Sequence, residues 1–179
     1  TQARPQAMRR EQSNSAVIFG DKALLKLFRR LEPGVNPDLE IGRHLTEMGF
    51  EHSPRIIGAL EYGKPKHERA TLAVLYEFVE NEGDAWGYTV DMVGDYFDRV
   101  VADSNLTVQA PSVTAQDLLF MSSQPVPDEA VATIGSAFID MARLLGQRTA
   151  EMHLALANVE DNAFVPEQFT PFYQRALYQ

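Results

Sequence analysis

The sequence predicts an α+β fold, in which a small, mostly antiparallel sheet with one packed helix is followed by a helical region. Three observations predict it. Short apolar runs separated by turn residues fill the segment 16–79. A strong helix start, Asn36-Pro37, interrupts these runs. After position 84 the apolar residues recur at helical spacing. Residues 1–10 are predicted to be flexible or the end of an upstream segment.

The composition excludes several classes of site. The 179 residues carry a net charge of −9, which argues against a nucleic-acid partner held by general electrostatics. They contain no cysteine, which excludes disulfides, thiolate nucleophiles and Cys-ligated metals. The four histidines have no metal-ligand spacing, and no Gly-x-Ser-x-Gly elbow is present. Without a signal peptide or an apolar run of about 20 residues, we expect a cytoplasmic protein with no membrane partner.

The sheet lobe is expected to cover residues 11–80. Four apolar runs bounded by turn residues are typical of strands, at 16–19, 23–28, 55–63 and 70–79. Asn36 is the expected N-cap of the helix, Pro37 suits its first position, and Gly49 is expected to end it. Glu40 should lie at the flank of the packed face. That face is expected to consist of Ile41, Leu45 and Met48.

The helical lobe is expected to cover residues 81–179. Apolar spacing predicts helices over 84–102 and 115–121 and one long helix over 128–157. The tail is rich in aromatic residues that little chain could cover. These residues are Phe164, Phe169, Phe172, Tyr173 and Tyr178. We therefore expect an exposed apolar surface and self-association through this lobe.

Lys26 lies within the second apolar run, where its ammonium group needs a partner. Glu40 follows it by 14 residues, in the first turns of the predicted helix. Kinase-type phosphotransferases use such a strand lysine to contact nucleotide phosphates and a helix carboxylate to hold it. On spacing alone, an edge-strand lysine that reaches water and a solvated glutamate explain the pattern more simply.

A short polar segment stands where kinases place a glycine-rich turn over the phosphates. It consists of Ser13, Asn14 and Ser15, directly before the first apolar run. Hydroxyls, an amide and backbone N–H groups could cradle a phosphate there. Three small polar residues before a strand are, however, usually only a turn.

Several blocks of the sequence resemble one family. The stretch EQSNSAVIFGDKALLKLFRRLEPGVNPDLEIGRHLTEMGF is similar to the start of bacterial maltokinases, especially those fused behind a trehalose synthase domain. The blocks LAVLYEFVENEGDAW, LGQRTAEMHLALA and FVPEQFTPFYQRALYQ resemble later parts of that family in the same order. The resemblance implies a two-lobed, eukaryotic-like kinase fold related to aminoglycoside and choline kinases. It implies transfer of the ATP γ-phosphate to the anomeric hydroxyl of maltose, which gives maltose 1-phosphate.

The resemblance also implies roles for the candidate residues. Lys26 would meet the ATP phosphates, and Glu40 would pair with it. The phosphate-covering turn would be formed by Ser13, Asn14 and Ser15. The hinge beside the adenine, acting through backbone groups, would be Glu77, Phe78 and Val79. The implied partners are ATP with Mg²⁺, maltose, and a trehalose synthase domain in the same polypeptide, within trehalose, glycogen and α-glucan metabolism.

The sequence departs from the family at the catalytic loop. Such kinases need an aspartate in an His-Gly-Asp-like loop and a later aspartate for Mg²⁺. No His-x-Asp triplet occurs in the 179 residues. We therefore expect an N-terminal fragment, with a nucleotide-binding N-lobe at 11–80 and an incomplete helical C-lobe at 81–179. It is predicted to be inactive alone, with no catalytic residue or metal ligand of its own and the Mg²⁺ ligands in an absent C-terminal part.

Two other functions stay open at this point. The chain could be a non-catalytic docking module of a trehalose synthase fusion, or part of another small-molecule kinase of the aminoglycoside or choline kinase type. Stabilisation by nucleotide separates the first alternative from a maltokinase, and substrate profiling separates the second.

Overall fold

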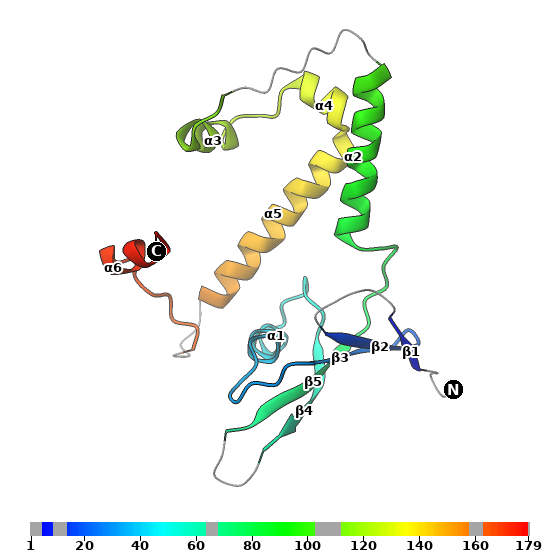
Figure 1. The fold of residues 1–179 in the computed structure, drawn as a ribbon, viewed down its shortest axis with the longest axis vertical. Helices are drawn as coiled ribbons and strands as arrows, with labels where there is room; N and C mark the ends of the chain where they lie inside the picture. The colour runs from blue at the N-terminus through cyan, green and yellow to red at the C-terminus, as the bar shows by residue number, and fades with distance from the viewer. Residues whose placement is uncertain (1–4, 9–13, 64–67, 103–111, 158–162, 179) are drawn as a thin grey trace. The chain divides into compact units, whose positions relative to one another are not determined.

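The computed structural model describes residues 5–8, 14–63, 68–102, 112–157 and 163–178. Within these ranges it contains five strands and six helices, so the predicted α+β class is confirmed (Figure 1). The strands are β1 (Pro5–Ala7), β2 (Ser15–Phe19), β3 (Ala23–Leu27), β4 (Ile56–Tyr62) and β5 (Ala70–Glu77). The helices are α1 (Pro37–Glu47), α2 (Ala85–Ala102), α3 (Ala115–Ser122), α4 (Asp128–Ile134), α5 (Ser136–Ala157) and α6 (Pro171–Leu177).

The strands form one antiparallel sheet in the order β1-β2-β3-β5-β4. The predicted hairpin and the two later strands are confirmed as β2–β3 and β4–β5. The sequence did not predict β1, because three residues with a proline show no strand periodicity. β1 pairs with β2, with Ala7 opposite Val17. β1 and β2 are therefore neighbouring antiparallel strands.

Helix α1 begins and ends as the sequence predicts. The side-chain oxygen of Asn36 accepts a hydrogen bond of 2.9 Å from the backbone N–H of Asp38, and Pro37 occupies the first turn. Gly49 lies just beyond the last turn with a φ of 72°, which glycine adopts without steric cost.

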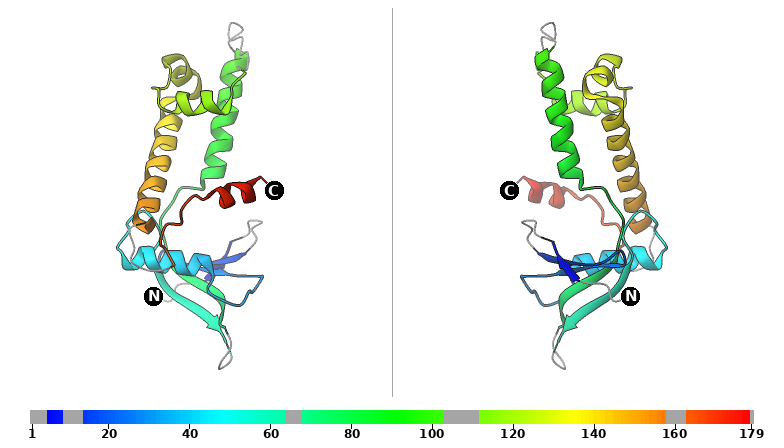
Figure 2. Two further views of the ribbon diagram at one scale, coloured as in Figure 1. Left: turned by 90° about the vertical axis from the view of Figure 1, so that its left-hand side faces the viewer. Right: turned by 90° about the vertical axis from the view of Figure 1, so that its right-hand side faces the viewer.

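The packed face of α1 differs in part from the prediction, since Leu45 is buried as predicted but Ile41 and Met48 are not. The residues that it buries are Leu39 and Leu45, only 1% and 2% exposed, whereas Ile41 and Met48 are 36% and 45% exposed. Gly42 lies on the buried side, where a Cβ atom would come within 2.6 Å of the Cδ1 atom of Ile56. The close approach at Gly42 turns the helix away from its more conspicuous apolar stripe. The helix lies against one side of the sheet, next to β4 and β5 (Figure 2).

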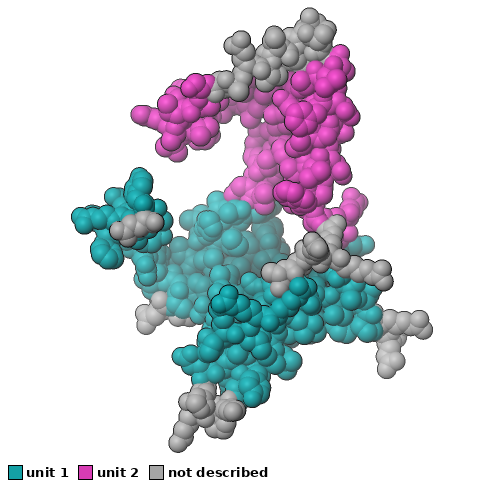
Figure 3. Space-filling view, viewed as in Figure 1, with its two compact units in different colours: residues 1–80, 148–179 teal, residues 81–147 magenta. Residues whose placement is uncertain are grey.

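The chain divides into two compact units (Figure 3). One unit comprises Thr1–Glu80 and Arg148–Gln179, and the other comprises Asn81–Gln147. The sequence prediction instead groups all of 81–179 in one lobe. No helix in the part of the chain that the structure describes has the length and apolarity needed to cross a membrane.

The expected helices over 84–102 and 115–121 correspond to α2 and α3, but the expected long helix is two helices. The break lies at Gly135. Its backbone angles, a φ of 103° and a ψ of 133°, are outside the helical region. Arg99 of α2 donates hydrogen bonds of 2.9 and 3.0 Å to the carbonyl oxygens of Thr133 and Ile134. This side chain satisfies carbonyl groups at the end of α4 that a continuous helix would pair internally.

Candidate functional site

Lys26 lies on β3, an inner strand of the sheet. Its direct cross-strand neighbours are Ala16 on β2 and Val74 on β5, and Val74 is fully buried. Directly opposite residues share one face of a sheet, so the Lys26 side chain leaves the sheet on the side of these two residues. A strand lysine in such surroundings needs a partner for its charge.

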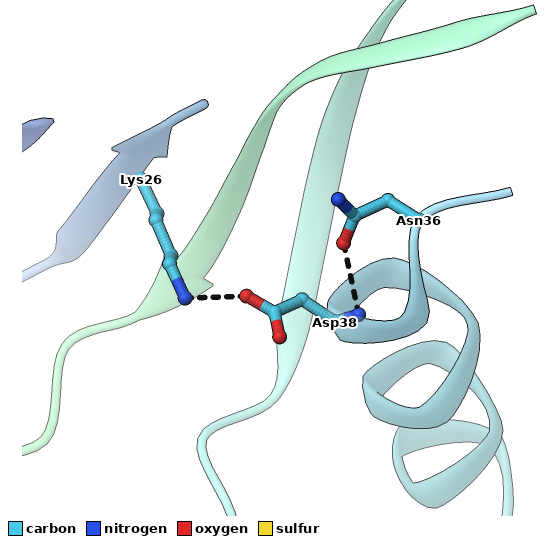
Figure 4. Close-up of polar contacts among 3 residues, drawn as sticks. All are labelled: Lys26, Asn36 and Asp38. Carbon is cyan, nitrogen blue, oxygen red and sulfur yellow. Dashed lines mark hydrogen bonds and ion pairs between the residues drawn. The ribbon is translucent and has the colours of Figure 1, made fainter. Parts of the chain in front are cut away.

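That partner is Asp38 (Figure 4). The Lys26 ammonium group donates a hydrogen bond to the Asp38 carboxylate, which lies in the first turn of α1. The backbone N–H of Asp38 donates to the side chain of Asn36, so the helix cap and the ion pair both hold Asp38. A carboxylate near a helix N-terminus is also favoured by the helix dipole. Asp38 is thus fixed from two sides and can aim the flexible lysine.

The predicted pairing of Lys26 with Glu40 is wrong. Glu40 is exposed, and among the described residues the carboxylate partner of Lys26 is Asp38. The reason is helical geometry. Two residues along a helix correspond to a rotation of about 200°, so Asp38 and Glu40 cannot both face the sheet. Burial of Leu39 and Leu45 fixes the rotation of α1 with Asp38 toward β3.

The Lys26 side chain is paired but only partly covered. Its side chain is 32% exposed, and that of Asp38 is 40% exposed. An ammonium group has three N–H donors, and the bond to Asp38 uses one of them. The group also lies 5.6 Å from the ring centroid of Phe28, a distance at which a cation is attracted to an aromatic face. Phe28 therefore belongs to the site, although the sequence pattern did not indicate it.

Tyr76, like Asp38 and Phe28, is a residue of the site that the sequence pattern did not indicate. It lies on β5, two residues after Val74, and therefore on the same face of the sheet as Lys26. Burial, with a smaller contribution from the Asp38 carboxylate, raises the pKa of the Tyr76 hydroxyl from 10.0 to about 12. The hydroxyl stays protonated at neutral pH and adds no charge to the surroundings of Lys26.

The raised pKa of Tyr76 predicts a loss of stability in alkali. Below pH 10 the hydroxyl is protonated in both the folded and the unfolded chain, so the full contribution to stability is present. Between pH 10 and about 12 the unfolded chain loses this proton more readily, so the free energy of unfolding should fall. Urea unfolding at pH 9, 10 and 11 should show a steeper fall for the natural chain than for Tyr76→Phe.

The matched control for this measurement is Tyr62→Phe, which changes an exposed tyrosine at the edge of the same sheet. It should leave the pH dependence of unfolding unchanged. Equal slopes for the natural chain and Tyr76→Phe would contradict the assignment.

The predicted phosphate-covering turn is only partly described. Ser13 lies outside the described residues, whereas Asn14 and Ser15 come at the end of the connection between β1 and β2. Ser15 is directly opposite Leu27, so its side chain lies on the face of the sheet opposite to that of Lys26. Its hydroxyl accepts a hydrogen bond of 3.3 Å from Arg29. Any contact of Ser15 with a ligand of Lys26 would therefore use the backbone.

The predicted hinge residues, Glu77, Phe78 and Val79, belong to the same compact unit as Lys26 but do not share a pocket with it. They line an open pocket of about 300 Å³, together with residues of the connection between α1 and β4, and Lys26 does not line this pocket. The backbone N–H of Glu77 donates to the carbonyl oxygen of Arg55 at 2.8 Å, and that of Phe78 donates to Lys22 at 3.0 Å. An adenine ring would have to use other groups of the segment Glu77–Val79. The pocket does not join the two halves of the predicted site.

The site's chemistry is that of a single positioned cation. In the described ranges, no group of three or more His, Cys, Asp or Glu side chains could hold a metal ion.

A comparison of the sequence with models of known protein families finds no match.

Proposed function

We propose that this chain forms the nucleotide-binding part of a maltokinase, in a polypeptide that also carries a trehalose synthase domain. The complete enzyme transfers the γ-phosphate of ATP to the 1-hydroxyl of maltose and produces maltose 1-phosphate. The sequence resemblance supports the family, and the surroundings of Lys26 support the kind of ligand. The proposal includes the eukaryotic-like kinase fold, with the sheet and α1 as its nucleotide lobe.

One observation carries the proposal: Lys26 is paired with a carboxylate and is still partly exposed. A lysine whose ammonium group were wholly covered could not reach a ligand, and an unpaired flexible lysine would be poorly aimed. Lys26 has a partner in Asp38 and an exposed fraction of 32%. This combination suits a group that offsets the charge of a phosphate.

The fold gives independent support. Because β1 pairs with β2, Asn14 and Ser15 come at the end of a connection between neighbouring strands. The cross-strand partner of Lys26, Ala16, follows this connection directly. In this proposal, the segment that ends at Asn14 and Ser15 covers the phosphate that Lys26 binds.

Each residue of the site has a defined part in this proposal. ATP supplies the phosphoryl group. Lys26 offsets the negative charge of its phosphates, and Asp38 holds the ammonium group in place. No His-x-Asp triplet occurs in the 179 residues, so the proposal assigns neither the catalytic base nor the Mg²⁺ ligands to them.

The experiment is product analysis with the natural full-length polypeptide. Incubation with maltose and Mg-ATP should give a phosphorus signal of a sugar 1-phosphate and release ADP in equal amount. Choline and aminoglycosides in place of maltose should give neither. Phosphorylation of one of these compounds, with none of maltose, would show another small-molecule kinase. ATP binding without transfer to any acceptor would favour a docking role.

A further inference from the structure

Helix α1 has a second contact on the side away from the sheet. The His44 ring stacks on the ring of Phe164, with centroids 4.4 Å apart and an angle of 27° between the planes. His44 follows Gly42 by two residues and is therefore rotated from it by about 200° around the helix. Gly42 packs against Ile56 of the sheet. Helix α1 is thus held from nearly opposite sides.

The contact between His44 and Phe164 is close. The Nε2 atom of His44 is covered from solvent and has no hydrogen-bond partner among the described residues. A covered nitrogen without a partner is unfavourable, so the ring contact must offset that cost. The sequence predicted an exposed Phe164. The structure instead packs it on α1, whereas Phe172 of the same tail is 83% exposed.

A second contact holds the chain directly after α1. The Nε2 atom of His52 lies 3.8 Å from a carboxylate oxygen of Glu151, and Arg148 donates to the same oxygen at 2.8 Å. The Phe50 ring meets the His52 ring edge-on, with centroids 5.6 Å apart. Arg148 and Glu151 belong to α5. The residues that contact α1 and the chain after it therefore come from Arg148–Gln179, which belongs to the same compact unit as the sheet.

We propose that this C-terminal part positions α1, and that Phe164 is a positioning residue for the pair of Lys26 and Asp38. Asp38 and His44 are six residues apart on one helix, a separation of about 9 Å. A helix moves as a stiff rod over this length, so a change of tilt at His44 also moves Asp38. Without the Phe164 ring, α1 loses its support opposite the sheet, and Asp38 holds Lys26 less firmly. The effect of Phe164 on α1 and on the pair of Lys26 and Asp38 does not depend on the proposed function. Only its consequence for nucleotide binding rests on the proposed function.

The test compares Phe164→Ala with Phe172→Ala in the chain as it is, without nucleotide. Amide hydrogen exchange over residues 37–47 should become about 3- to 10-fold faster in Phe164→Ala, the effect expected from the loss of one aromatic pair. Exchange in β5 should stay unchanged. An amine-reactive ester should acylate Lys26 faster, relative to Lys22 on the same hairpin. Phe164→Tyr, which keeps the ring, should restore both values, and Phe164→Leu should not.

A second variant approaches the contact from the other side. His44→Ala should have the same two effects, and combining it with Phe164→Ala should add little. Unchanged exchange in α1, a uniform rise that includes β5, or full rescue by Phe164→Leu would each overturn the proposal. If α1 responds as expected but ATP does not protect Lys26 in the natural chain, the positioning role stands and the proposed function fails.

Discussion

Replacing Lys26 by methionine should lower the rate of ATP-dependent maltose phosphorylation by about 10²–10³-fold in the natural full-length polypeptide. The change removes one preorganised charge from the phosphates while it keeps an unbranched side chain of similar length. The measurement is maltose-dependent ADP release at saturating substrates. Lys22→Met is the matched control, because Lys22 is an exposed lysine on the same hairpin and should be replaceable without loss. A rate within about twofold of the natural enzyme for Lys26→Met would contradict the assignment.

A double-mutant cycle with Asp38 extends this prediction. Asp38→Asn should cost about tenfold or less, because Asp38 aims the lysine and does not itself touch phosphate. The double variant should be no slower than Lys26→Met alone, since the two residues act as one unit. Glu40→Gln should have no effect, because Glu40 is exposed and does not pair with Lys26. Additive losses at Lys26 and Asp38, or a loss at Glu40, would show that Asp38 does not position Lys26.

Replacing Leu39 by alanine should destabilise the sheet-bearing unit by about 2–5 kcal/mol. Leu39 is 1% exposed and has one of the largest fully buried side chains in the described part of the chain. Truncation leaves a cavity between α1 and the sheet that the surrounding side chains can fill only partly. Urea unfolding followed by far-ultraviolet circular dichroism measures the effect.

Ile41→Ala is the matched control for Leu39→Ala. Ile41 belongs to the face that the sequence predicts to be packed, but it is 36% exposed, so the loss should be below about 1 kcal/mol. A larger loss at Ile41 than at Leu39 would show that α1 packs on its more conspicuous apolar stripe.

Much of the sheet lobe could be predicted because its signals are local. Asn36, Pro37 and Gly49 mark the ends of α1 through backbone chemistry that does not depend on the rest of the fold. The hairpin around Gly20 follows in the same way from turn geometry, and Gly20 has a φ of 60°. That Lys26 needs a partner for its charge could be predicted from the cost of an unpaired charge in a strand.

The identity of that carboxylate could not be predicted, because it depends on how α1 is rotated. The rotation follows from the burial of Leu39 and Leu45 together with a close approach at Gly42, where an absent side chain leaves no hydrophobic signal in the sequence. The strand β1 and the stacking of Phe164 on His44 depend on pairing between segments, which periodicity does not report. The spacing of Leu39, Gly42 and Leu45, each three residues from the next, could have indicated the packed face.

Whether Lys26, held by Asp38, binds a nucleotide phosphate can be tested directly. The most direct measurement treats the chain with an acyl phosphate of ATP, which transfers its acyl group to a lysine amine beside the phosphates and releases ATP. Mass spectrometry then locates the modified lysine. We expect acylation of Lys26 over Lys22, suppression of this labelling by excess ATP, and slower labelling of Lys26 in Asp38→Asn. Equal labelling of both lysines, or labelling of Lys26 that ATP does not suppress, would contradict it.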